Sequence, residues 1–291
     1  MKQLHSTRPQ AGFSLIELMI SIAIGLVMIV FVTSLYVRSR GSYEVHDDNA
    51  RLQQEGRIVM ALIGRNLTQA GYGVPQSIVA GALQTNFTGQ ALRACDAGFT
   101  DPADTSKPGC GAGGKPAFEV SYVVNPVVNT NIGAGVDCNG QTVPANAAGD
   151  LIVINRFYLA SGAGEGQSLY CSGNGGPTPQ PLLGNVEDMR LTYGVSTRDS
   201  RRPDGFVTTV AAVQAAEASA VPRVRPFQGV VTVAVCLQLV GASAATTIDQ
   251  TYRDCTGAQK TATDHKIHTV LNGVFTLRNN ADTTLIQYPT P

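Results

Sequence analysis

The chain has 291 residues with 21 basic and 21 acidic side chains, which gives a formal net charge of zero at pH 7. Without an excess of positive charge to attract nucleic acid, a nucleic-acid-binding function is not expected. Charged residues make up 14% of the chain, hydrophobic residues 43%, and the mean hydropathy is +0.04. These values exclude a disordered chain and a membrane protein with many spans. The length allows one sizeable domain and an appendage.

The chain begins with an apolar stretch long enough to cross a membrane. Residues 18–37 (LMISIAIGLVMIVFVTSLYV) carry no charge, and as a helix they span about 30 Å, the thickness of bilayer hydrocarbon. The preceding segment contains Lys2 and Arg8 and no acid, which is the charge pattern of a secretory signal. Because no A-x-A cleavage site follows the stretch, we expect it to be retained as a single-pass anchor.

The orientation of this anchor is inferred from the cysteines, because basic residues flank it on both sides, Lys2 and Arg8 before it and Arg38, Arg40 and Arg51 after it. The six cysteines include no CxxC pair and no Cys/His cluster at zinc spacing, which favours disulfides on an oxidising side of the membrane. Reduced, buried thiols are the alternative. Order in the sequence suggests three local loops, each worth about 3 kcal/mol, closed by Cys95 with Cys110, Cys138 with Cys171, and Cys236 with Cys255.

Glu17 lies next to the apolar stretch, where a carboxylate at membrane depth costs roughly 2.5 to 3.5 kcal/mol. It is either an interfacial residue or one partner of a buried ion pair. Residues 12–18, GFSLIEL, resemble the class III signal of type IV pilins and type II secretion pseudopilins. The resemblance implies that a prepilin peptidase cuts after Gly12 and N-methylates Phe13, and that the Phe13 ammonium of a neighbouring subunit neutralises Glu17. A plain membrane anchor is the alternative.

After the apolar stretch, residues 42–70 form an amphipathic helical pattern. We expect this segment to continue the membrane helix, giving one helix of about 55 residues that ends near Gly71 and Gly73. Three glycines inside it are candidate bends, at positions 25, 41 and 56. A coiled coil with a partner is less favoured, because the seven-residue register is short. Many pilins have a proline in the middle of the membrane helix, and this sequence has none there.

The remaining sequence predicts an α+β domain, with the long helix laid across an antiparallel sheet in a pilin-like fold. Residues 75–117, rich in Gly, Pro, Ala, Thr and Asn, predict a long surface loop tied by its two cysteines. Residues 206–220 are alanine-rich and predict a short helix. β-branched and aromatic residues predict strands at 118–124, 151–159, 168–171, 186–195, 230–239 and 270–277.

Three downstream segments resemble PilW-type minor pilins. They are residues 62–73 (LIGRNLTQAGYG), 185–195 (NVEDMRLTYGV) and 274–279 (VFTLRN). The J-type minor pseudopilin of type II secretion, a close relative, is the alternative. In the second segment we expect Met189, Leu191 and Tyr193 to face the core. The charged residues beside them either contact a neighbouring pilin or are solvated: Glu187, Asp188 and Arg190.

No catalytic motif is present, so we expect no enzyme activity, no metal site and no cofactor. His265 and His268, three residues apart in an expected strand, should lie on opposite faces. A calcium-loop pattern at Asp96, Asp101 and Asp104 is broken by Pro102 and lacks the distant glutamate. A membrane-tethered periplasmic enzyme or sensor remains a less favoured alternative.

The resemblance also implies a division of the chain and a set of partners. Residues 1–12 are the leader, 13–37 the membrane and filament-core helix, 38–74 its amphipathic continuation, and 75–291 a periplasmic domain with disulfides. The implied partners are a prepilin peptidase, other minor pilins, the major pilin and the inner-membrane assembly platform. The expected location is the inner membrane first and the pilus at the cell surface later, with a role in priming pilus assembly, twitching motility and adhesion.

Overall fold

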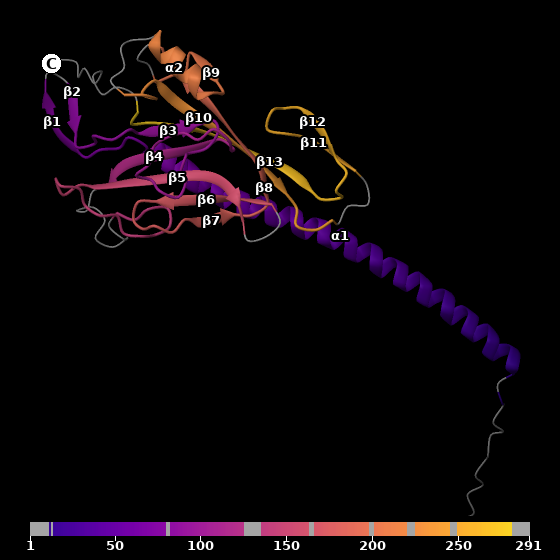
Figure 1. The fold of residues 1–291 in the computed structure, drawn as a ribbon. Helices are drawn as coiled ribbons and strands as arrows, with labels where there is room; N and C mark the ends of the chain where they lie inside the picture. The colour runs from indigo at the N-terminus through magenta and orange to yellow at the C-terminus, as the bar shows by residue number, and fades with distance from the viewer. Residues whose placement is uncertain are drawn as a thin grey trace, which may run out of the picture.

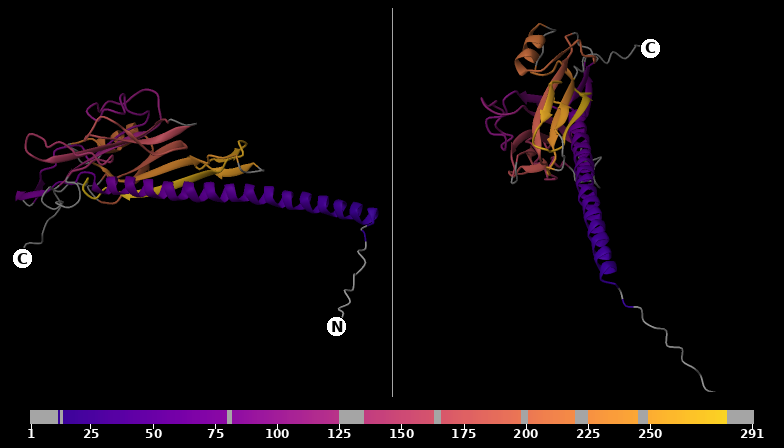
Figure 2. Two further views of the ribbon diagram at one scale, coloured as in Figure 1. Left: turned by 90° about the horizontal axis from the view of Figure 1, so that it is seen from below. Right: turned by 90° about the vertical axis from the view of Figure 1, so that its right-hand side faces the viewer.

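One long helix and a β-rich head make up the chain (Figure 1). The computed structural model describes residues 12, 14–79, 82–124, 135–162, 166–197, 201–219, 225–244 and 249–280. Helix α1 (Leu15–Gln69) has 55 residues. Its N-terminal part extends away from the head, and its C-terminal part lies along the head (Figure 2). The predicted length and end of this helix are therefore confirmed.

The head contains two antiparallel sheets, of order β3-β4-β5-β6-β7 and β13-β10-β8-β9, and two separate hairpins, β1-β2 and β11-β12. This confirms the predicted α+β class. A short helix, α2 (Val210–Ala218), follows β9. The strands are β1 (Pro75–Val79), β2 (Ala82–Thr85), β3 (Leu92–Cys95), β4 (Ala117–Val124), β5 (Leu151–Ser161), β6 (Gln167–Gly173), β7 (Gln180–Leu183), β8 (Val186–Val195), β9 (Gly205–Val207), β10 (Val230–Val240), β11 (Gln250–Arg253), β12 (Gln259–Ala262) and β13 (His268–Thr276).

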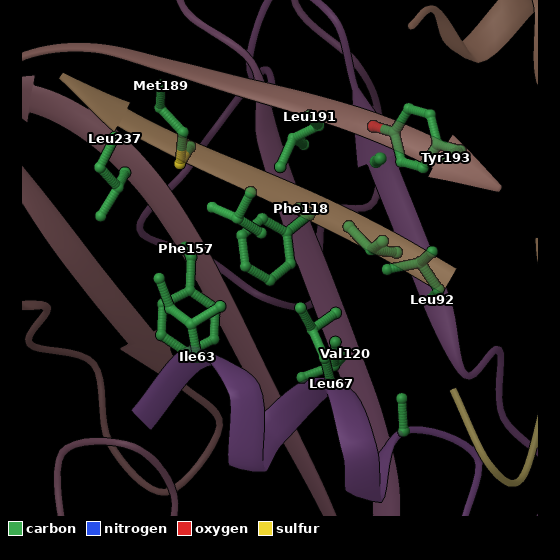
Figure 3. Close-up of a cluster of buried hydrophobic side chains, with 14 of the residues drawn as sticks. Ile63, Leu67, Leu92, Phe118, Val120, Phe157, Met189, Leu191, Tyr193 and Leu237 are labelled. Carbon is green, nitrogen blue, oxygen red and sulfur yellow. The ribbon is translucent and has the colours of Figure 1, made fainter. Parts of the chain in front are cut away.

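The core lies where the two sheets and the C-terminal part of α1 meet. Ile63 and Leu67 of α1 are fully buried and face Phe118 and Phe157 of the first sheet (Figure 3). The predicted core face of β8 is confirmed, because three of its alternate side chains are buried in the same cluster: Met189, Leu191 and Tyr193. The two sheets form two sides of the core, and the apolar face of α1 contacts both sheets and forms the third side.

Two glycines let α1 approach the sheet closely. A Cβ atom at Gly56 would overlap the Leu271 side chain of β13, and a Cβ atom at Gly64 would overlap the Phe275 ring of the same strand. At Gly41, on the part of α1 that precedes this contact, a Cβ atom would meet nothing within 4 Å. The glycines beneath β13 thus act as packing positions, since any larger residue would push the helix from the strand.

The predicted loop over 75–117 is wrong in its first half. It contains β1, β2 and β3, and Leu92 and Cys95 of β3 are fully buried. Short strands between Gly and Pro residues carry a weak local signal, and β3 is fixed by pairing with β4. The predicted 206–220 helix is likewise too long: β9 precedes α2, which begins only after Thr209 caps it by accepting a hydrogen bond from the Ala212 N–H.

The rest of the 75–117 segment is organised by Arg156 of β5, which is fully buried. Its guanidinium forms an ion pair with Glu119 of β4 at 2.6 Å and lies 3.9 Å from the centre of the Phe99 ring. It also donates hydrogen bonds to four backbone carbonyls of the loop that follows β3, those of Asp101, Asp104, Thr105 and Lys107. One buried cation therefore holds this loop on the sheet.

The three disulfides join the same cysteine pairs that the order in the sequence suggested: Cys95–Cys110, Cys138–Cys171 and Cys236–Cys255. Each connects a strand to a peripheral segment, since Cys95, Cys171 and Cys236 lie on β3, β6 and β10. The pairs therefore fasten the loop after β3, the segment around Cys138 that precedes β5, and the β11-β12 hairpin to the two sheets.

We expect Gly64→Val to lower the thermal stability of the full chain in detergent by about 1 to 3 kcal/mol, because the added methyl groups overpack the contact with Phe275. Gly41→Val is the matched control, since it makes the same change in the same helix where no neighbour is close. Equal melting temperatures for the two variants would show that α1 does not depend on this close approach.

We expect Arg156→Lys to destabilise the head by about 3 kcal/mol, because an ammonium cannot replace the guanidinium fork and leaves Glu119 and several carbonyls short of donors. Arg190→Lys is the control: its ion pair with Asp188 is at the surface, where the change should cost less than about 1 kcal/mol. Urea unfolding of both variants measures the difference, and a smaller loss for Arg156→Lys would contradict the buried-cation role.

Candidate functional site

The N-terminal start of α1 holds the predicted processing and assembly residues. Gly12 and Ser14 are exposed and precede the helix, which begins at Leu15. Phe13, the expected new N-terminus and methylation site, lies outside the described residues, as do Lys2 and Arg8. The backbone N–H of Ser14 donates a hydrogen bond to the Glu17 carboxylate at 3.0 Å. Glu17 therefore caps the first turn of its own helix, and it is exposed in the single chain.

The apolar side chains that follow Glu17 have no partner in the chain. The 18-residue window of α1 that is apolar enough to cross a membrane has a mean hydropathy of 2.8 and none of it is buried. Large apolar side chains from Leu15 to Val37 are all more than half exposed. Such a surface is unstable in water and requires lipid or other apolar helices around it. The first part of α1 is thus built for an apolar environment outside the head.

The downstream half of α1 has two different faces. Leu52, Val59 and Ile63 are buried against the head, whereas Ile58 is 63% exposed. Two further apolar side chains of the predicted amphipathic segment 42–70, Val45 and Leu62, are only partly buried. One face of this segment therefore holds the head, and the opposite face is open along the same helix that carries the apolar N-terminal part.

The charged residues of β8 make contacts inside the chain. Asp188 forms ion pairs with Lys115 at 2.9 Å and with Arg190 at 3.0 Å. Glu187 accepts a hydrogen bond from the Gln238 side chain at 2.6 Å. The sequence left open whether these three residues contact a neighbouring pilin or solvent. The structure shows that all three already have partners within the single chain.

A cluster around His268 was missed by the sequence reasoning. His265 lies outside β13 in a left-handed turn, with φ 57°, so the opposite-face argument for the two histidines does not apply. The buried His268 ring lies 3.1 Å from Glu187 on one side and 3.1 Å from Asp264 on the other, and it stacks on Tyr252 with ring centres 4.6 Å apart. Glu187 lies on β8, Tyr252 on β11, Asp264 after β12 and His268 on β13, so no local sequence motif predicts that they form a cluster.

The electrostatics of this cluster favour a negative Asp264. Burial raises the pKa of its carboxyl, but hydrogen bonds from the Lys266 backbone N–H and from His268 outweigh burial, so the pKa lies below the ordinary value. Burial also raises the pKa of the Tyr252 hydroxyl, helped by the negative Glu187. The arrangement ties the β11-β12 hairpin to the sheet by side-chain hydrogen bonds and by ring stacking.

The acidic residues that form a broken calcium pattern have internal partners. Asp96 accepts a hydrogen bond from the Val210 N–H at the start of α2, at 2.9 Å. Asp101 and Asp104 share Lys107, at 2.7 and 3.2 Å, and the hydrogen bond from Lys107 lowers the pKa of Asp101. Among the residues that the structure describes, no group of three His, Cys, Asp or Glu side chains is placed to hold a metal ion.

Two family models match the chain over segments that contain these features. Residues 7–33 match the prokaryotic N-terminal methylation motif, and residues 156–279 match the family of Type IV pilus-assembly protein W. A methylation motif at the start of one long, apolar helix that carries an antiparallel head defines a type IV pilin. Within this class, the match of residues 156–279 to the PilW family supports a minor pilin of the type IV pilus, of the PilW family.

The PilW match includes two of the three segments that suggested this family, residues 185–195 and 274–279. Neither family match favours the pseudopilin alternative. One solved structure, "Type IV-like pilin TTHA1219 from Thermus thermophilus", is 16% identical to this chain, with a TM-score of 0.42, and the likeness covers 79% of this chain and 99% of that one. No curated protein matches the chain.

Proposed function

We propose that the first part of α1 holds the precursor in the inner membrane, with the head in the periplasm, until the subunit enters a pilus. The apolar window of α1, none of which is buried in the chain, supports the anchor. Three disulfides in the head support an oxidising compartment on that side. The same apolar surface that contacts lipid then packs against the helices of neighbouring subunits. Both the membrane and the filament therefore require this part of α1 to be apolar.

The observation that carries the assembly role is the continuity of α1. A single helix from Leu15 to Gln69 provides the apolar surface at one end and a wall of the head's core at the other. Packing its N-terminal part into a filament therefore displays the head on the outside without any change in the head. The role is structural: this subunit, with other minor pilins, primes assembly of the major pilin on the inner-membrane platform, and it supports motility and adhesion.

Processing by a prepilin peptidase precedes this assembly. The proposed cut lies between Gly12 and Phe13, and it turns the Phe13 nitrogen into an ammonium that is then methylated. In an apolar filament core, Glu17 would be an uncompensated buried charge, which costs several kcal/mol, unless an ammonium from a neighbouring subunit lies beside it. Glu17 and Phe13 are accordingly the proposed ion pair between subunits.

We expect Gly12→Val to leave the full-length precursor in the membrane, because the peptidase must accommodate the residue before the cut. Intact-mass measurement of the membrane fraction detects the 12 retained residues, 1–12. Gly41→Val, a substitution in the same chain beyond the apolar stretch, should be processed normally. A mature N-terminus at Phe13 in the Gly12→Val variant would contradict the cleavage assignment.

We expect both Glu17→Ala and Glu17→Gln to insert into the membrane and to be cleaved, yet to be depleted at least about tenfold from sheared pili. The glutamine variant separates the two roles of Glu17. Its amide oxygen still accepts the Ser14 hydrogen bond and preserves the helix cap, but it has no charge for the ion pair. Immunoblots of pili against the membrane fraction measure the ratio, and wild-type incorporation of Glu17→Gln would reduce Glu17 to a helix cap.

A further inference from the structure

A pocket opens beside the end of β13, at the edge of the core and away from the N-terminal part of α1. Its volume is about 320 Å³, and it is lined by Arg201, Val231, Thr276, Leu277 and Arg278. This volume is at the small end of the range for ligand pockets and accommodates a group of a few heavy atoms. The two arginines are 77 residues apart in the sequence, and the end of the second sheet brings them to one hollow.

The pocket gathers the two arginines of the described head that have no partner there. In the described part of the chain, neither Arg201 nor Arg278 has an ion pair or a hydrogen bond. Every other described arginine of the head has at least one such interaction: Arg93, Arg156, Arg190, Arg202, Arg225 and Arg253. Both arginines are exposed and positively charged, and guanidinium groups form charge-assisted hydrogen bonds with anions.

The floor of the pocket narrows the choice of anion. Val231 and Leu277 are each 2% exposed, and the Leu277 N–H already donates to the Val231 carbonyl at 2.9 Å. The buried lining residues are therefore apolar, while Thr276 and the two arginines are the polar lining residues. We propose that this pocket binds a carboxylate on a short aliphatic stem, with the carboxylate between the arginines and the stem on the floor.

The position of the pocket excludes a lipid headgroup as its occupant. Asn279, the next residue after Arg278, donates a hydrogen bond to the Thr68 carbonyl at 3.3 Å, close to the C-terminal end of α1. About 30 helical residues separate Thr68 from the apolar stretch, which corresponds to roughly 45 Å of helix. Two sources of the carboxylate remain: a free small molecule, or an acidic side chain or C-terminus of a neighbouring subunit, the latter resting on the proposed function.

Titration of the full chain in detergent micelles with butyrate tests the pocket directly, with the arginine Nε–H signals followed by NMR. We expect saturable shifts at two arginines, and about tenfold weaker binding in Arg201→Gln and in Arg278→Gln. Arg57→Gln, which removes an exposed arginine of α1, should bind butyrate as the wild type does. Butyramide, the uncharged analogue, should not bind. Butyrate shifts that do not saturate, or equal loss in Arg57→Gln, would overturn the proposal.

The variant Asp199→Asn tests whether a carboxylate of the same chain already fills the pocket. Asp199 is the acid nearest to Arg201 in the sequence, and it lies outside the described residues. Equal butyrate binding by this variant and the wild type is expected. Binding that appears only in Asp199→Asn would show that the chain neutralises its own pocket, and the proposal would be wrong.

The source of the carboxylate is identified with a photo-crosslinking residue in place of Thr276. A crosslink to another pilin that butyrate suppresses, and that Arg278→Gln abolishes, assigns the pocket to a neighbouring subunit. Butyrate binding without such a crosslink assigns it to a free carboxylate. Because butyrate binding is measured on the isolated chain and cleavage after Gly12 is measured in membranes, failure of the pocket and failure of the pilin assignment give different results.

Discussion

The contact between α1 and β13 is the constraint on which the rest of the structure depends. Gly56 and Gly64 bring the helix so close to Leu271 and Phe275 that these side chains occupy the space of the missing Cβ atoms. Ile63 and Leu67 of the same helical segment then reach the first sheet as well. A head attached only by a loop could rotate about its helix. Here the helix is part of the core, so the direction of the N-terminal half fixes the orientation of the head.

The head itself is charge-poor, and its few charges are used at particular points. Arg156 donates hydrogen bonds to backbone carbonyls of the loop after β3, while Lys107 pairs with the side chains of Asp101 and Asp104. The loop is thereby neutralised by the chain's own cations. On the other sheet, His268 lies between Glu187 and Asp264 and joins a hairpin to the sheet in the same manner. Both devices pair a buried cationic or polar group with acids from distant segments.

The sequence predicted well those features whose signal is local and periodic. The apolar stretch and the stripe after it define α1, and alternation in 186–195 places Met189 and Tyr193 in the core. Features that depend on distant contacts were missed. Strand β3 has a weak local signal and is fixed by β4, the His268 cluster joins four segments, and the pocket brings together Arg201 and Arg278. No spacing rule predicts that such residues are neighbours, because only the folding of the intervening chain brings them together.

The disulfides attach the peripheral segments of the head to its two sheets. None of them crosses the contact between α1 and the sheets; each fastens a peripheral segment to a strand that is already paired. A subunit that leaves a bilayer for a filament exchanges the surroundings of its apolar helix while its head stays in water. Burial of the C-terminal part of α1 in the core holds the helix in place on the head during that exchange. The disulfides hold the peripheral segments that the core does not reach. The head can therefore keep one shape in both settings, which is what a subunit that presents a surface to its neighbours requires.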